Sequence, residues 1–427
     1  MTTKSLPFSA GQARAWQAEI PTPFYVYDAA GIAATVQALK SAFAWNPGFR
    51  EYFAVKACPT PAILRLLQSL GCGADCASVS ELELARRSGI TGERIVFSSN
   101  ETLPEEYQLA LKLNAIINLD DLTQVDRLME AAGAENFPVP EKICCRYNPG
   151  QFQMTSDIMG HLYDSKYGMP KNQLMEAMKK LKAWGVREFG IHAMLQSCSL
   201  EEIYYPKLAG ELFALAVEIQ QQLGIRLSFI DLSGGIGIPY RPEEKPVDIS
   251  AIGEGVRQVY EEILTPAGLF PALCTEMGRY ITGPYGFLMA KVVGHKHIYK
   301  EYVGIDASAC DHMRPAMYGA YHHITVLGKE GQQTHPVDVV GALCENNDKF
   351  AVDRPLPETE IGDLVVIHDS GAHCRSMGYN YNGRTRCGEY LLREDGSLKM
   401  IRRAETLQDL FATFDVDPEF CVRGEEI

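Results

Sequence analysis

A lysine stands directly after a short apolar segment near the start of the chain. Residues 51–61 read EYFAVKACPTP, in which Lys56 follows four apolar residues and precedes two prolines. A lysine in this position is either a solvent-facing cap or a buried amine, and burial lowers the pKa of an amine. A neutral amine can form a Schiff base with a carbonyl compound. Lys56 is therefore a candidate nucleophile.

A glycine-rich loop follows another apolar segment, in FIDLSGGIGIPY at residues 229–240. The part SGGIG (233–237) could expose backbone N–H groups to a phosphate. The spacing is not G-x-G-x-x-G, so a tight turn explains this loop equally well when it is taken alone. The next apolar segment ends in EMGRY (276–280), which adds an acid and an arginine.

A strand-end lysine, a phosphate loop and an acid at the end of another strand suit one cofactor, pyridoxal 5′-phosphate. Lys56 would hold the cofactor covalently, and the loop would bind its phosphate. Glu276 would pair with the protonated pyridine nitrogen, which makes the ring a strong electron sink. The three features together therefore predict a pyridoxal-phosphate site.

The elements that must position these residues follow a repeated pattern, in which short apolar segments alternate with stretches at helical spacing. The apolar segments end at 53–57, 73–78, 94–100, 115–120, 142–148, 189–195, 228–235 and 272–279, and the helical stretches include 60–71, 80–89, 104–114, 172–185, 205–224 and 252–264. Eight strands alternating with helices predict an α/β protein with a (β/α)₈ barrel. An open doubly wound sheet is the alternative, because alternation alone does not separate the two. Polar residues at the ends of all eight segments favour the barrel, whose active sites lie at that face.

The pattern changes after about residue 285, where strand-like segments with glycine-rich turns predominate. Asp395 and Gly396 form a strong hairpin signal. The segment TPFYVYDA at 22–29 is a further strand that could join this second part. We therefore predict a barrel domain at residues 30–284 and a mainly β domain, of sandwich or barrel type, at 1–29 and 285–427.

Composition limits the classes of partner. The 427 residues are 46% hydrophobic, the formal net charge is −14 and the pI is near 5.3. This acidity argues against nucleic acid or an anionic membrane as the main partner. The twelve cysteines form neither a zinc signature nor a disulfide framework. With no secretory segment and no apolar run of about 18 residues, we expect a cytoplasmic protein with reduced thiols.

Nine stretches carry a resemblance to a known family. They are YFAVKA, GCGADCASVSEL, RYNPG, SKYGMP, GGIGIPY, TEMGRYITGPYG, MRPAMY, GALCENND and MGYNYN. The chain resembles the fold-type III pyridoxal-phosphate-dependent decarboxylases, specifically the diaminopimelate decarboxylases, over nearly its whole length. The resemblance implies a (β/α)₈ barrel with a β domain, pyridoxal 5′-phosphate, and a homodimer whose active sites are shared across the interface.

The resemblance also assigns cofactor contacts. It implies that Lys56 is the Schiff-base lysine, that Asp75 lies near it, and that Glu276 faces the pyridine nitrogen. The remaining contacts that it implies are Ser197, Gly235, Gly278, Arg279 and Tyr381. A buried amine is then the better interpretation of Lys56. Taken alone, Asp75 would more often be a helix cap, and Tyr379 competes with Tyr381.

Residues for the substrate are also implied. Cys344 would protonate the reacting carbon and Glu345 would hold the distal amine, both from the other subunit, although a lone cysteine is more often inert. The set that would face the substrate is Arg279, Arg314, Tyr318, Glu345 and Tyr381. A distal end with both a carboxylate and an ammonium satisfies this set. Lysine or ornithine would leave buried arginines unpaired, at a cost of roughly 3–5 kcal/mol.

The expected reaction is thus decarboxylation of meso-2,6-diaminopimelate to L-lysine and CO₂, the last step of lysine biosynthesis. One alternative is a decarboxylase of another basic amino acid, namely lysine, ornithine or arginine. Another is a non-catalytic homologue that binds the cofactor.

The chain departs from the family pattern at three positions. HAMLQS (192–197) stands where the family has HxHIGS, so Met194 replaces the ring-stacking histidine and Gln196 replaces a glycine. A thioether can contact an aromatic face, and His192 could compensate, so both are expected to contact the cofactor. His373 replaces a tyrosine. The histidine clusters at 295–297 and 322–324 are expected at the surface or an interface, and no metal is assigned.

Overall fold

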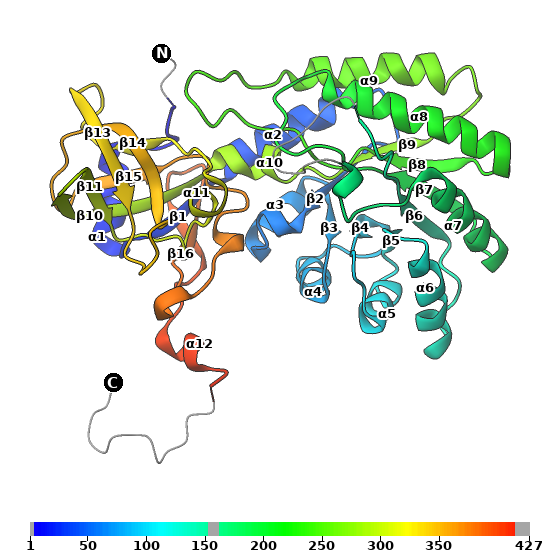
Figure 1. The fold of residues 1–427 in the computed structure, drawn as a ribbon, viewed down its shortest axis with the longest axis horizontal. Helices are drawn as coiled ribbons and strands as arrows, with labels where there is room; N and C mark the ends of the chain where they lie inside the picture. Colours follow the sequence, from blue (N-terminus) through cyan, green and yellow to red (C-terminus); the bar gives the residue numbers. More distant parts are fainter. Residues whose placement is uncertain (1–3, 153–161, 415–427) are drawn as a thin grey trace.

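The computed structural model describes residues 4–152 and 162–414 of the chain. Eight parallel strands close into a barrel, which forms one half of the molecule in Figure 1. They are β2 (Arg50–Ala54), β3 (Gly73–Cys76), β4 (Ile95–Phe97), β5 (Ile116–Leu119), β6 (Lys142–Arg146), β7 (Glu188–His192), β8 (Leu227–Asp231) and β9 (Ala272–Thr275). Because β9 pairs back with β2, through Glu51 and Thr275 among others, the predicted barrel is confirmed and the open sheet is excluded.

Helices alternate with these strands and cover the outside of the barrel (Figure 1). They are α2 (Ala29–Ala42), α3 (Pro61–Ser69), α4 (Val79–Arg87), α5 (Pro104–Lys112), α6 (Thr123–Ala134), α7 (Lys171–Trp184), α8 (Tyr204–Leu223) and α9 (Ile249–Ile263). In α9, the buried residues Ile249, Ile252, Val256 and Tyr260 recur every three or four positions, so they share the face that meets the barrel. The remaining helices are α1 (Ala10–Glu19), α10 (Arg279–Thr282), α11 (Arg314–Tyr318) and α12 (Leu407–Phe411).

The second half of the molecule is a nine-stranded sheet. It contains β1 (Phe24–Asp28), β10 (Gly286–His297), β11 (Glu301–Ile305), β12 (Ile324–Val326), β13 (Thr334–Val340), β14 (Lys349–Pro357), β15 (Leu364–Ile367), β16 (Gly388–Leu392) and β17 (Leu398–Arg402). The central path runs β14-β13-β11-β10-β1-β16-β17. Strand β1 lies between β10, antiparallel to it, and β16, parallel to it, which confirms that residues 22–29 supply a strand to this sheet.

The turn between β16 and β17 is the hairpin predicted at Asp395 and Gly396. The two strands are antiparallel, Gly396 has φ of +79°, and the N–H of Arg393 donates to the carbonyl of Ser397. The exact boundary between the two domains stays a prediction. All cysteines in the described part of the chain are free thiols. Within the same residues, no helix combines the length and apolar character needed to cross a membrane.

Candidate active site

A cavity opens at the carboxyl ends of the barrel strands, where the sequence predicted the site. Its lining residues are Ala54, Lys56, Asp75, Ala77, Ser98, Asn100, Arg146, Tyr167, His192, Met194, Ser197, Cys198, Ser233, Gly234, Gly235, Ile236, Glu276, Gly278, Arg279 and His373. All but one of them come from the barrel. His373 comes from the second domain, where its N–H donates to the carbonyl of Ala57 at 2.9 Å. The second domain therefore closes one side of the cavity.

Lys56 lies two residues beyond the end of β2, in a short 3₁₀ helix at Val55–Ala57. Its Nζ donates to Oδ2 of Asp75 at 2.7 Å, and its side chain is 54% exposed toward the cavity while that of Asp75 is 1% exposed. Burial lowers the pKa of Lys56, but the carboxylates of Asp75 and Glu276 outweigh this effect and raise the pKa above its usual value. The expectation of a buried, neutral amine is therefore wrong for the protein alone, because Asp75 holds the lysine as an ammonium ion.

Glu276 carries a buried negative charge at the centre of the cavity. Its Oε2 accepts hydrogen bonds from Nε2 of His192 at 3.1 Å and from the hydroxyl of Ser233 at 3.0 Å. Burial raises the pKa of Glu276, but the attraction and hydrogen bond of His192, together with Lys56 and Ser233, outweigh it and leave the pKa at about 2. Glu276 is thus ionised throughout the physiological range.

The loop after β8 is held rigidly against the turn after β9. The hydroxyl of Tyr205 donates to the carbonyls of Ser233 and Gly234, at 2.6 and 2.8 Å. The N–H of Glu276 donates to the carbonyl of Ser233 at 2.8 Å. Gly235 has φ of +108°, and a Cβ there would lie 2.7 Å from the carbonyl oxygen of Gln196. Only glycine fits this position, so the loop brings its backbone directly to the cavity.

These residues fit pyridoxal 5′-phosphate. The second carboxylate oxygen of Glu276, Oε1, is buried and has no hydrogen-bond partner among the described residues, so it can accept from a protonated ring nitrogen. The amine of Lys56 opens into the same cavity. Gly235 and Gly278 line the cavity, and the close packing against them admits no side chain at either position, so only their backbone can face a phosphate group. The acid, the amine and the glycines therefore match the ring nitrogen, the aldehyde and the phosphate of the cofactor.

The residues that depart from the family pattern also line the cavity. Met194 receives a hydrogen bond on its sulfur from the hydroxyl of Ser233 at 3.1 Å, and it lies beside His192 at the end of β7. Burial, with the positive charges of Arg279, Lys56 and Arg314, keeps the pKa of His373 well below its usual value. His373 is accordingly a neutral side chain in the cavity.

A half-buried arginine, Arg279, and a buried one, Arg314, are linked through one tyrosine. Arg279 donates to the hydroxyl of Tyr240, and the guanidinium of Arg314 lies 4.7 Å from the centre of the same ring. Arg314 is 5% exposed and its Nη1 donates to Nε2 of His322 at 2.7 Å. Among the residues the structure describes, neither arginine has a carboxylate partner. Arg279 lines the cavity, whereas Arg314 lies behind Tyr240.

Besides Arg314, four predicted residues do not line the cavity of their own chain. Tyr318 and Tyr381 are 51% and 49% exposed, and Cys344 and Glu345 are also exposed. The segments of Cys344 and Tyr381 do meet, because the N–H of Cys344 donates to Oδ1 of Asn382 at 2.7 Å. These residues therefore lie on the outer surface of the second domain.

Some lining residues were not predicted as contacts. Arg146 ends β6, pairs with Asp120 at 3.3 Å and lies 4.5 Å from the ring centre of Tyr167. Its place at a strand end was a usable signal. Tyr167 lies in SKYGMP, one of the stretches that carry the family resemblance, although no role was assigned to it. Ser233 was assigned to a phosphate loop, whereas its hydroxyl contacts the acid and the methionine.

Comparisons with known proteins show the family of the chain. The family model described as pyridoxal-dependent decarboxylase, pyridoxal binding domain, matches residues 29–283. Protein TabA of Pseudomonas amygdali pv. tabaci is 41% identical over 91% of this chain and 90% of that protein. Diaminopimelate decarboxylase of Methanothermobacter thermautotrophicus is 35% identical over 92% of this chain and 91% of that one.

Solved structures give the same result. Diaminopimelate decarboxylase from M. jannaschii in complex with L-lysine superposes with a TM-score of 0.88 at 30% identity, covering 95% of each chain. The Helicobacter pylori enzyme complexed with L-lysine gives a TM-score of 0.86 at 30% identity, over 93% of this chain and 98% of that one.

The barrel, the second β domain and the lysine, acid and glycine loop define a fold-type III enzyme that uses pyridoxal 5′-phosphate. Within that class, the chain belongs to the pyridoxal-dependent decarboxylase family, and pyridoxal 5′-phosphate is its cofactor.

Proposed function

We propose that the protein decarboxylates meso-2,6-diaminopimelate to L-lysine and CO₂, as in lysine biosynthesis. The observation that carries this proposal is the pair Arg279 and Arg314, which share Tyr240 and have no carboxylate partner among the described residues. A buried and a half-buried cation without a counter-ion are costly, so they favour a ligand that supplies an anion. Diaminopimelate offers a second carboxylate at the end remote from the reacting carbon.

The bound cofactor supplies an electron-withdrawing ring that accepts the electron pair left when CO₂ departs. Lys56 provides the amine that attaches the cofactor, and Asp75 orients it through the 2.7 Å contact. Glu276 stays ionised and holds the proton on the ring nitrogen, while His192 and Ser233 fix the direction of its carboxylate. The loop at Gly235 orients the phosphate end.

The proton that replaces CO₂ needs a donor. We infer that Cys344 supplies it and that Glu345 receives the distal ammonium, both from the second subunit of a homodimer. The exposed position of these residues, remote from the cavity lining of their own chain, supports a donor from another copy. Tyr318 and Tyr381 are proposed to reach the substrate in the same way.

A second candidate is decarboxylation of a different amino acid that carries a distal carboxylate. It is favoured by the higher identity to protein TabA than to the diaminopimelate decarboxylases. It is also favoured by Met194 and His373, which line the cavity and depart from the diaminopimelate decarboxylase pattern. Lysine, ornithine and arginine are disfavoured substrates, because none supplies a second carboxylate to the arginines.

The test is CO₂ release by the holoenzyme from meso-diaminopimelate, lysine, ornithine, arginine and 2-aminoadipate, measured side by side. We expect turnover of meso-diaminopimelate to exceed that of the other four.

Arg314→Ala should reduce kcat/KM for diaminopimelate far more than for any activity on lysine. An equal loss on both substrates would show that Arg314 does not recognise the distal carboxylate. Preferred turnover of aminoadipate would favour the second candidate. Cofactor absorbance without CO₂ release from any substrate would favour a non-catalytic homologue.

A further inference from the structure

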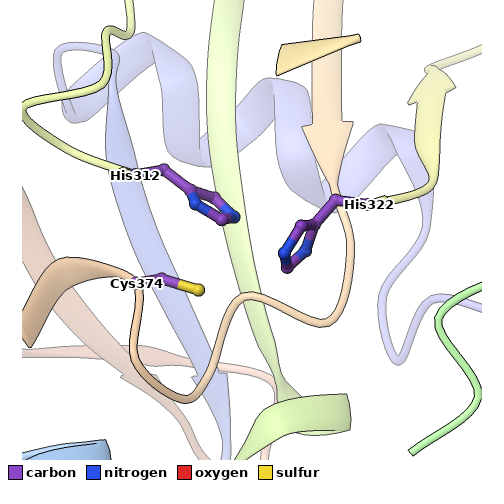
Figure 2. Close-up of side chains that lie close together, drawn as sticks. All are labelled: His312, His322 and Cys374. Atoms are coloured by element: carbon purple, nitrogen blue, oxygen red, sulfur yellow. The ribbon is translucent and has the colours of Figure 1, made fainter. Parts of the chain in front are cut away.

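Three buried side chains from separate segments converge in the second domain. His312 precedes α11, His322 lies between α11 and β12, and Cys374 follows β15. Each offers one ligand atom, and these atoms all lie within 4.8 Å of one another. Figure 2 shows both imidazole rings and the sulfur pointing into the same space. The expectation that the histidines at 322–324 lie at the surface or an interface is wrong for His322, which is fully buried beside residues distant in sequence.

His312 has no hydrogen-bond partner that would explain its burial. It is 1% exposed, and neither Nδ1 nor Nε2 has a partner among the described residues. Leaving a buried polar atom unsatisfied costs about 1–3 kcal/mol. His312 is buried despite this cost, and its ring faces a second histidine and a thiol. This arrangement indicates that a ligand from outside the protein satisfies it.

His322 is oriented as metal-binding histidines commonly are. Its Nδ1–H donates to the carbonyl of His368 at 2.9 Å, which leaves the lone pair on Nε2. That lone pair accepts a hydrogen bond from Nη1 of Arg314 at 2.7 Å. A metal ion and Arg314 would use the same electron pair, so only one of them can occupy it at a time.

The donor set selects the class of ion. Two imidazole nitrogens and one thiol sulfur suit zinc and similar transition metals, whereas calcium and magnesium prefer oxygen ligands. Ligand atoms around a tetrahedral zinc lie roughly 3.3–3.8 Å apart, so the side chains must close by roughly 1 Å. On binding, Cys374 would release its thiol proton to solvent, and the thiolate charge would offset one charge of the ion.

We propose that His312, His322 and Cys374 form a binding site for a zinc-class divalent ion, and that the ion competes with Arg314 for Nε2 of His322. Occupancy removes the acceptor that anchors the guanidinium of Arg314, and the positive charge of the ion repels the guanidinium from its present position. Arg314 then recognises the distal carboxylate less well, so the ion weakens substrate binding more than it slows the chemistry. This inhibitory consequence rests on the proposed function, whereas the ion site does not.

The site itself is tested with Co²⁺ added to the holoenzyme. We expect one cobalt ion bound per chain, with a thiolate-to-cobalt charge-transfer band in the near ultraviolet. The band should disappear in Cys374→Ser and weaken in His312→Leu, which replaces the imidazole with an apolar side chain of similar size. It should survive in Cys344→Ser, which removes the exposed thiol and serves as the matched control.

The result that would overturn the site is a wild-type protein without the band, or a band that persists in Cys374→Ser. If His312→Leu fails to fold, judged by circular dichroism and cofactor absorbance, His312→Gln takes its place. If that variant also fails, the stoichiometry and the Cys374→Ser and Cys344→Ser pair decide the question.

The competition is tested by steady-state kinetics with Zn²⁺ on whichever substrate the enzyme turns over. We expect zinc to raise KM severalfold with little change in kcat, and Cys374→Ser to abolish this effect while keeping its basal activity. An occupied cobalt site with no zinc effect on KM would overturn the competition alone. An enzyme without diaminopimelate activity would refute the proposed function and leave the cobalt experiment unaffected.

Discussion

At the scale of single residues, the site depends on a carboxylate that remains charged although it is buried. Glu276 is 6% exposed, and its three neighbours His192, Ser233 and Lys56 hold its pKa at about 2, compared with an ordinary value of 4.5. A neutral acid would not hold a proton on the ring nitrogen. The environment of Glu276 is therefore as important to the chemistry as the residue itself.

Glu276→Gln should retain the cofactor but reduce kcat by about 100-fold, because an amide provides no negative charge to the ring nitrogen. Stopped-flow and steady-state measurements on the loaded enzyme check this expectation. Ser250→Ala, which alters an exposed position on α9, is the matched surface control. Unchanged turnover in Glu276→Gln would mean that Glu276 has a structural role only.

The same pKa predicts how stability depends on pH. A carboxylate whose folded pKa lies below its unfolded value stabilises the fold above the unfolded pKa, and this contribution is lost as pH falls through the folded pKa. For Glu276 the loss therefore runs from about pH 4.5 down to about pH 2. Urea unfolding of the wild type should lose free energy between about pH 4.5 and pH 3 more steeply than Glu276→Gln does. Parallel slopes would contradict the assignment.

Met194 tests whether a thioether contacts the cofactor ring. Met194→His restores the residue that the family pattern has at this position, and Ser233 can donate to an imidazole as it does to the sulfur. We expect an active enzyme with a shifted absorption spectrum of the bound cofactor. Met194→Leu, which keeps an apolar side chain without sulfur, is the comparison. If the histidine variant has the wild-type spectrum, Met194 does not contact the ring.

At the scale of elements, the loop after β8 brings its backbone to the cavity. It can do so because Gly235, where the neighbouring residues approach most closely, has no side chain. Gly235 has a positive φ and lies against both the carbonyl of Gln196 and the ring of Tyr204. The hydroxyl of Tyr205 donates to the carbonyl of Ser233 and so fixes the loop. A side chain at position 235 must therefore displace a rigid neighbour.

Gly235→Ala should weaken cofactor affinity by about tenfold or more, equivalent to about 1.4 kcal/mol, as measured by fluorescence titration of the apoenzyme. The control is Gly224→Ala at the end of α8, where φ is also positive, at +60°, but a Cβ would meet nothing within 4 Å. That variant should lose some stability and keep its affinity. Equal affinities in the two variants would show that the loop does not bind the phosphate.

Much of this arrangement could be predicted from the pattern of elements, since a polar residue lies within two positions of the end of every barrel strand. The strand before Lys56 nevertheless ends at Ala54, because the chain turns into a 3₁₀ helix at Val55. The resemblance implies that Asp75 lies near Lys56, but the 2.7 Å contact that keeps the amine charged depends on the register in which β2 pairs with β3 and could not be predicted. The grouping of His312 with Cys374 depends on the second sheet in the same way.

At the scale of the whole molecule, the residues proposed for one reaction lie on two different surfaces. Lys56 lines the barrel cavity, while Cys344 and Glu345 are exposed on the second domain. In a two-fold symmetric dimer, the barrel cavity of each subunit would face the second domain of its partner. The dimer would then contain two complete sites. The proposed dimer and the proposed proton donor therefore depend on each other.

Mixing two inactive variants, Lys56→Ala and Cys344→Ala, tests this dependence. Random exchange makes about half of the dimers mixed, and each mixed dimer has one intact site, so roughly a quarter of wild-type activity should return. The matched control is Lys56→Ala mixed with Glu276→Ala. Both residues line the cavity of one chain, so no mixed dimer has an intact site and no activity should return. No recovery in the first mixture, with subunit exchange demonstrated by mass spectrometry, would exclude a shared site.

The position of β1 in the second sheet has a consequence for how the chain is made. Strand β1 lies between β10 and β16, and the hydroxyl of Tyr27 donates to Glu389, 362 residues further along the chain. At about 5–20 residues per second, a ribosome takes on the order of tens of seconds to reach that partner. Until β10 has been synthesised, the apolar strand β1 has no partner in this sheet, and it is paired on both sides only once β16 follows. A prematurely terminated chain would keep it unpaired, so truncated products should aggregate or require a chaperone.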